Sequence, residues 1–179
     1  MPAVPERWKK WIPSPVTLIL IAFVAYFWFR PPAKVADENR PLPPFQVQLV
    51  GGGDLSSQDL KGKVVLVNYW ATWCPYCLKE MPEIEKFWQK YRNQGFTVVA
   101  ISADDSPDKI RAWFAQHGYG FPAAPDNATT RRAFGYVGVL PTSFILDRQG
   151  NLRHTVEGQL YYGRLKDLVV PLLQQAKPK

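Results

Sequence analysis

The chain has 179 residues, of which 46% are hydrophobic, and a formal net charge of +7. This length allows one domain with an appended segment, and the apolar content is ample for a buried core. The basic residues are scattered, which argues against a nucleic-acid partner, and two cysteines are too few for a scaffold of several disulfides.

The N-terminal 30 residues differ from the rest of the chain. Basic residues precede an uncharged run over residues 11–29, and Arg30 and two prolines close it. As a helix this run would be about 28 Å long, enough for a bilayer core, with aromatic residues near its ends as at membrane interfaces. A cleaved signal peptide is the alternative, but a good cleavage site is missing. We therefore expect residues 1–30 to be a signal anchor with one transmembrane helix and a cytoplasmic N-terminus.

Residues 31–44 contain five prolines and charges of both signs. Segments of this composition are extended spacers. We predict a proline-rich tether here, followed by one folded domain over residues 45–179.

The predicted domain alternates strands and helices. Predicted strands cover residues 45–49, 64–69, 96–102, 121–124, 143–147 and 152–157. Glycines predict a turn at 51–54, and residues 55–63 are expected to form a short helical turn and a second turn. Predicted helices extend from the cysteine motif to residue 93 and over residues 106–117, 129–134 and 161–176, the last interrupted at Pro171. This order, closed by a hairpin and a helix, predicts an α/β sheet with helices on both faces.

Two cysteines in a C-x-x-C spacing, Cys74 and Cys77, come directly after the buried strand over residues 64–69. Pro75 suits the first position of a helix, so Cys74 falls at a helix start. There the unpaired N–H groups and the helix dipole stabilise a thiolate. Cys77, one turn later, is within reach of Cys74 and can attack a mixed disulfide formed there. The motif predicts a redox-active dithiol.

Two plainer interpretations of the cysteine pair stay open. Zinc requires four ligands, and the only histidines, His117 and His154, have no ligand-like spacing. A structural disulfide is the second interpretation, after a zinc site. The adjacent Trp70 and Trp73 and the helix start suit a reactive thiol better. We expect no metal and no cofactor besides the redox-active disulfide.

Two motifs carry a family resemblance: Trp73-Cys-Pro-Tyr-Cys77 and Val139-Leu-Pro-Thr-Ser-Phe-Ile-Leu-Asp147. Together they resemble the thioredoxin fold. More narrowly, the chain from about residue 43 onward is similar to the membrane-anchored TlpA/ResA-type (DsbE-like) thioredoxin-family proteins of the bacterial envelope. The resemblance implies a thioredoxin fold with an N-terminal β extension and a central insertion over residues 103–134.

The resemblance also implies roles for individual residues. Cys74 corresponds to the attacking cysteine and Cys77 to the resolving one, so Cys74 should be the more exposed. Pro141 matches a cis-proline that faces the dithiol. Leu140 precedes it, and its backbone is expected to pair with an extended substrate segment. Trp73 is expected either to contact the substrate or to pack the site.

An acidic residue is the last member of the expected site. Asn68 stands where thioredoxin has a buried aspartate that accepts a proton, and an amide cannot do this. Glu80 matches an acid that the TlpA/ResA-like branch places near the dithiol, so we expect it to be buried, with a raised pKa. A solvated helix acid is the alternative.

These features predict a thiol:disulfide oxidoreductase that acts on cysteine-containing client proteins outside the cytoplasmic membrane. The resemblance favours a reductant, as in cytochrome c maturation, recharged by a membrane thiol electron donor. A disulfide-forming oxidase is the alternative. A peroxidase would need Thr and Pro where Ala71 and Val67 stand, and a copper-binding module would need C-x-x-x-C and a late histidine.

Overall fold

The computed structural model describes residues 14–29, 33–104 and 106–175. Contacts between Cα atoms divide the chain into two compact units, residues 1–32 and 33–179. The predicted domain boundary at residue 45 therefore differs from the observed one, because residues 33–44 fold with the second unit.

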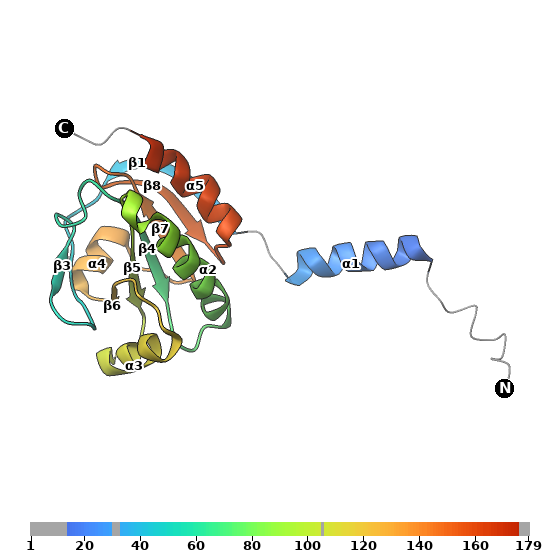
Figure 1. The fold of residues 1–179 in the computed structure, drawn as a ribbon, viewed down its shortest axis with the longest axis horizontal. Helices are drawn as coiled ribbons and strands as arrows, with labels where there is room; N and C mark the ends of the chain where they lie inside the picture. The colour runs from blue at the N-terminus through green and yellow to red at the C-terminus, as the bar shows by residue number, and fades with distance from the viewer. Residues whose placement is uncertain (1–13, 30–32, 105, 176–179) are drawn as a thin grey trace. The chain divides into compact units, whose positions relative to one another are not determined.

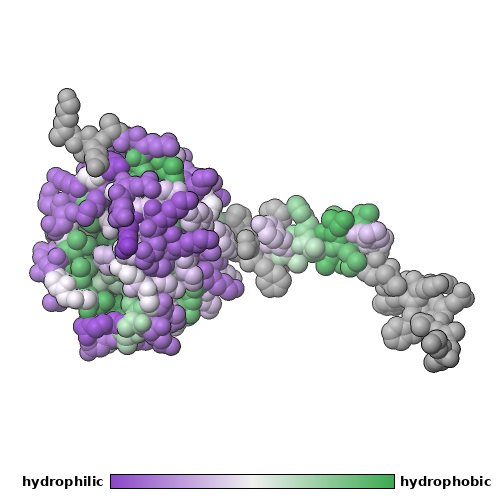
Figure 2. Space-filling view, in the orientation of Figure 1, coloured by the Kyte–Doolittle hydropathy of each residue, from purple (hydrophilic) through white to green (hydrophobic). Residues whose placement is uncertain are grey.

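The first unit contains helix α1, Pro15–Phe29, which has no charged residue. Its described side chains are mostly exposed, and Figure 2 shows a largely apolar surface along this helix. Within the described ranges, no helix is both long and apolar enough to cross a membrane. The transmembrane helix expected over residues 11–29 is therefore not found there, and its first residues, 11–13, lie outside the described part of the chain.

The second unit is built on a mixed six-stranded sheet with the strand order β1-β8-β7-β4-β5-β6 (Figure 1). Its strands are β1 (Lys34–Pro41), β4 (Val64–Trp70), β5 (Phe96–Ser102), β6 (Ala123–Pro125), β7 (Thr142–Leu146) and β8 (Asn151–Glu157). Strand β4 pairs in parallel with β5 and antiparallel with β7, and β7 and β8 form the closing hairpin. The predicted α/β sheet is thus confirmed.

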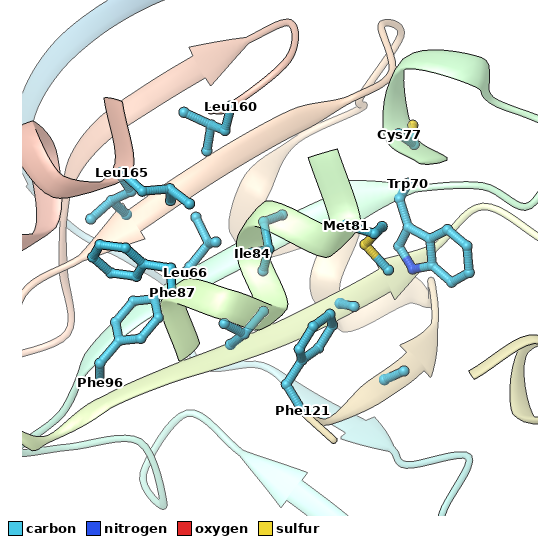
Figure 3. Packing of buried hydrophobic residues seen from close by; sticks show 14 of the residues in the cluster. Leu66, Trp70, Cys77, Met81, Ile84, Phe87, Phe96, Phe121, Leu160 and Leu165 are labelled. Atoms are coloured by element: carbon cyan, nitrogen blue, oxygen red, sulfur yellow. The ribbon is translucent and has the colours of Figure 1, made fainter. Parts of the chain in front are cut away.

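Central strand β4 is buried along its whole length because both faces of the sheet are covered. The helices are α2 (Pro75–Tyr91), α3 (Pro107–His117), α4 (Ala128–Phe134) and α5 (Tyr162–Gln174). Alternate β4 side chains enter two cores: Leu66 joins a cluster with residues of α2, α3 and α5, and Val67 joins a cluster with residues of α4. Figure 3 shows Met81 and Ile84 of α2 and Phe96 of β5 in the first cluster.

A small hairpin precedes the central strand. Strands β2 (Gln46–Gln48) and β3 (Asp54–Ser56) pair antiparallel, and the glycines between them provide the positive φ angles of the turn. Asp54, expected in the turn, is the first residue of β3, and turns rather than a helix follow to residue 63. This hairpin is the N-terminal β extension of the fold.

Strand β1 corrects the predicted tether. Residues 34–41 pair antiparallel with β8 instead of forming a free spacer. The prolines of this segment stand at its ends, so they do not interrupt the pairing, although the register shifts between Asp37 and Arg40. Val35 packs against the first core cluster, and β1 covers the edge of β8 that would otherwise be unpaired.

The last helix also differs in one detail from its prediction. Helix α5 continues through Pro171 to Gln174. Proline removes only one N–H donor from the helix, and this one lies near the helix end. Val169 and Leu172, buried on either side, pack the last turns against the core.

Candidate active site

The cysteine motif lies at the start of α2, directly after the end of β4. Cys74 is the N-cap residue of α2, and its Sγ accepts a hydrogen bond from the Cys77 N–H at 3.2 Å. Pro75 occupies the first helical turn, where its missing N–H costs little. The predicted helix start is therefore confirmed, and this is the position at which unpaired N–H groups and the helix dipole favour a thiolate in the reduced protein.

Cys74 and Cys77 form a disulfide with a Cα–Cα distance of 5.3 Å. Both residues are buried, but Cys74 keeps 4% of its surface exposed and Cys77 none. Cys74 is thus the more exposed of the two, as predicted, by a small margin. The two histidines are engaged elsewhere: His117 stacks on Trp113, and His154 pairs with Asp37 at 2.7 Å.

Glu80 lies one helical turn after Cys77, and both residues are fully buried. Residues three apart on a helix share a face, so the carboxyl group lies on the side of α2 that Cys77 occupies. The prediction that Glu80 is buried is confirmed. Burial raises the pKa of Glu80 to about 8, although hydrogen bonds from the Leu160 N–H and from Asn68 act in the opposite direction.

The partners of Glu80 were not predicted from the sequence. Asn68 Nδ2 donates to Glu80 Oε1 at 2.7 Å, and the Leu160 N–H donates to Glu80 Oε2 at 2.7 Å. Asn68 Nδ2 also donates to Ser143 Oγ at 3.0 Å. One signal was available: an asparagine at a core-facing position of a buried strand must find a hydrogen-bond partner inside the protein.

The peptide bond between Leu140 and Pro141 is cis, as predicted. Strand β7 begins at the next residue, Thr142, which pairs with Tyr69 near the end of β4. Since the cysteine motif follows the end of β4, this register brings the Leu140–Pro141 bond to the same end of the sheet as the disulfide.

A cleft of about 550 Å³ lies beside this end of the sheet, with both Trp73 and Leu140 in its wall. The Trp73 side chain is 65% exposed, so it is not a packing residue of the core. Tyr136, which no sequence motif indicated, also lines the cleft and is 92% exposed. Two residues expected to contact a substrate thus share one open surface.

A second buried carboxylate holds the loop before the cysteines. Asp104 accepts hydrogen bonds from the Thr72 N–H at 2.7 Å and from the Ser102 hydroxyl at 3.1 Å, and it pairs with Lys109 at 2.6 Å. Burial would raise the pKa of Asp104, but these hydrogen bonds outweigh it and lower the pKa below its ordinary value. The ionised Asp104 therefore holds Thr72, two residues before Cys74, in place.

Comparison with known proteins agrees with this geometry. The model of the AhpC/TSA family matches residues 39–155. The thiol-disulfide oxidoreductase ResA of Bacillus cereus is 31% identical over 158 residues, which are 88% of this chain and 89% of the relative. The thioredoxin-like protein YneN of Bacillus subtilis is 32% identical over 148 residues, 79% of this chain and 86% of YneN.

Solved structures show the same fold. A thiol:disulfide interchange protein of the thioredoxin family from Chlorobium tepidum superposes with a TM-score of 0.71 at 29% identity, covering 77% of this chain and 99% of that one. A secreted thiol-disulfide isomerase from Corynebacterium glutamicum, at 22% identity, has a TM-score of 0.74 over 82% of this chain and 96% of its own.

Proposed function

The chain belongs to the AhpC/TSA family, and we propose that it is a thiol:disulfide oxidoreductase that exchanges the Cys74–Cys77 disulfide with cysteines of client proteins. One observation carries the proposal: the disulfide sits at a helix start, with a fully buried carboxyl group of raised pKa one turn behind the second cysteine. Thiol-disulfide oxidoreductases among the relatives support the same chemistry.

In the reducing direction, the Cys74 thiolate attacks a client disulfide and forms a mixed disulfide, and one client thiolate leaves. The Cys77 thiol then loses its proton to the Glu80 carboxylate. The resulting Cys77 thiolate attacks Cys74 Sγ, which closes the disulfide and releases the second client thiolate. Two electrons thus pass from the dithiol to the client. The same steps in reverse describe the oxidising direction.

Glu80 suits the role of proton acceptor in this sequence. A general base works best when its pKa lies near the working pH, because then both its ionised and protonated forms are accessible. A pKa of about 8 satisfies this condition, whereas an ordinary solvated glutamate would be too weak a base. We therefore assign Glu80, with Cys74 and Cys77, to the catalytic residues.

Client binding is assigned to the cleft beside the disulfide. Its exposed aromatic side chains, Trp73 and Tyr136, offer apolar contact area to a client segment. Leu140, in the same wall, would pair its backbone with that segment, as in other cases of strand addition. Pro141 would hold this edge next to the disulfide.

We further propose that the protein acts as a reductant, that its catalytic domain is extracytoplasmic and that the N-terminal segment anchors it. The resemblance to anchored envelope reductases, including those of cytochrome c maturation, supports them. A reductant in an oxidising compartment must be recharged, so a membrane thiol electron donor is the implied partner. The alternative is an oxidase that makes disulfides in its clients.

The direction can be tested by trapping the cellular redox state of the two cysteines with an alkylating reagent. A reductase is found mainly reduced, and it becomes oxidised when its membrane donor is deleted. A protein that stays oxidised with the donor present, and that oxidises reduced substrates when purified, is an oxidase. Insulin reduction by the purified chain tests the chemistry itself. The Cys74→Ser variant should neither reduce insulin nor oxidise reduced substrates.

A further inference from the structure

A buried polar pair lies behind Glu80, and the exchange steps given above use neither of its members. Asn68 on β4 and Ser143 on β7 are both fully buried, and they are direct partners in the antiparallel register of the two strands. The Asn68 amide donates one hydrogen bond to Glu80 and one to Ser143. A single amide group therefore connects the carboxyl group on α2 to the sheet.

The position of Asn68 is one that an apolar residue would normally fill. Leu66 and Trp70, two residues away on either side, point to the same face and belong to the first core cluster. Asn68 Oδ1 is buried and has no hydrogen-bond partner among the described residues. An unpaired buried acceptor costs about 1–3 kcal/mol, so an asparagine here lowers stability unless the amide has a further role.

The two oxygens of Glu80 are held in different ways. Oε2 accepts from the backbone N–H of Leu160, which is a donor in every protonation state. A proton gained by Glu80 is therefore placed better on Oε1, the oxygen that faces Asn68. There it meets the amide group, which carries both a donor and an acceptor.

We propose that Asn68 and Ser143 are positioning residues for Glu80 and that the Asn68 amide rotates when Glu80 gains or loses its proton. This inference rests on the proposed role of Glu80 as proton acceptor. With Glu80 ionised, the amide NH2 donates to Oε1 and to the Ser143 hydroxyl, as the structure shows. With Glu80 protonated, a rotation by about 180° turns Oδ1 inward, and Oδ1 accepts from Glu80 and from the Ser143 hydroxyl.

Three features make such a rotation feasible. Asn68 Oδ1 has no hydrogen-bond partner among the described residues, so the rotation breaks no hydrogen bond of this oxygen. A serine hydroxyl can act as donor or acceptor, which lets Ser143 follow either orientation. Asparagine also adds no second charge, whereas an aspartate at this position would compete with Glu80 for the proton.

The two groups that donate hydrogen bonds to Glu80 are neutral. They are the Leu160 N–H from the segment before α5 and the Asn68 amide from the sheet, which in turn bonds to Ser143. No charged side chain forms a hydrogen bond with Glu80 in the described part of the chain. The ionisation of Glu80 therefore depends on burial and on these few hydrogen bonds. The Asn68 amide consequently has a strong influence on the pKa of Glu80.

The test is a pH titration of the full, oxidised chain in detergent, followed by NMR of the Glu80 carboxyl carbon and of the Asn68 side-chain amide. We expect both signals to change with the same midpoint, and the Asn68 change to vanish in Glu80→Gln. Asn68→Leu, which removes the donor to the ionised form, should raise the Glu80 midpoint by about one pH unit. Ser143→Ala should move it less.

Thr142→Val is the matched control, because it removes a neighbouring hydroxyl of β7 that bonds to the Val139 carbonyl instead. It should leave the Glu80 midpoint unchanged. An Asn68 amide signal that ignores the titration of Glu80 overturns the inference, and this measurement needs no variant that must fold. An unchanged midpoint in folded Asn68→Leu also overturns it.

Client exchange is measured separately. If Glu80→Gln exchanges disulfides at the wild-type rate while the Glu80 and Asn68 signals of the wild-type chain titrate together, the proposed catalytic role of Glu80 fails and the coupled amide stands.

Discussion

Two buried carboxylates flank the cysteine motif, and they behave in opposite ways. Glu80, behind Cys77, accepts only neutral donors, and burial raises its pKa to about 8. Asp104, beneath the loop before Cys74, has Lys109 and three hydrogen bonds from Thr72 and Ser102, which lower its pKa against the effect of burial. The comparison shows that partners, together with depth, decide whether a buried acid moves protons or fixes a loop.

The largest expected effect concerns stability against pH. Folded Glu80 holds its proton up to about pH 8, whereas in the unfolded chain it loses the proton near its ordinary pKa of 4.5. The folded state therefore binds more protons between these values, and stability falls as the pH rises through this window. We expect Glu80 to contribute a loss on the order of 4 kcal/mol. Urea unfolding of the oxidised protein at pH 5 and pH 9 measures it, and Glu80→Gln should remove this part of the loss. An equal loss in the variant would contradict the raised pKa.

The next effect is on the rate of exchange. Glu80→Gln removes the proton acceptor for Cys77, so insulin reduction should slow by roughly 10²-fold and lose its dependence on the Glu80 titration. Glu83→Gln is the matched control, because Glu83 is a partly exposed acid of α2, and this variant should react at the wild-type rate. Wild-type kinetics in Glu80→Gln from pH 5 to pH 9 would reduce Glu80 to a structural acid.

The Asp104 side of the comparison predicts a change in stability rather than in pH profile. Asp104→Asn breaks the pair with Lys109 and weakens the hold on Thr72, at a cost of about 2 kcal/mol in the free energy of unfolding at pH 7. Because the pKa of Asp104 is lowered, this stabilisation is present above its ordinary pKa of 3.8 and is lost as the pH falls through the folded value. Chemical denaturation checks both statements. Asp108→Asn, an exposed acid of α3, should change stability little.

The smallest effect separates client binding from both carboxylates. Trp73→Ala removes an exposed ring from the cleft, so client affinity should fall about tenfold, as is typical of an aromatic contact. The pH profile and the free energy of unfolding should stay at their wild-type values. A binding titration with a client peptide and a denaturation curve measure the two. A loss of stability without a loss of affinity would make Trp73 a packing residue.

The local parts of the site were predictable from the sequence. Strand β4, the helix start at Cys74 and the apolar stripe of α2 follow from periodicity and from the place of Pro75. The cis bond before Pro141 and the buried Glu80 came from the family resemblance, because neither spacing nor composition specifies them.

The non-local parts were not predictable in the same way. The bond between Asn68 and Glu80 depends on how α2 packs on the sheet, and a single sequence does not give that geometry. The charged and proline-rich composition of residues 34–41 predicts a tether. In the structure these residues instead form β1, which pairs with the edge of β8. Pairing with a distant strand overrides such local preferences.

The pairing of β1 also decides at which end of the sheet the chain enters the second unit. Its first residue, Lys34, pairs with Glu157, which pairs with Thr142, which in turn pairs with Tyr69 near the end of β4. The chain therefore enters the second unit at the end of the sheet that carries the disulfide. Any restraint on the chain before residue 33 acts at this end, and residues 34–41 add no slack to it. A cysteine-containing client that reaches the disulfide therefore binds at the same end of the sheet at which the chain enters the second unit.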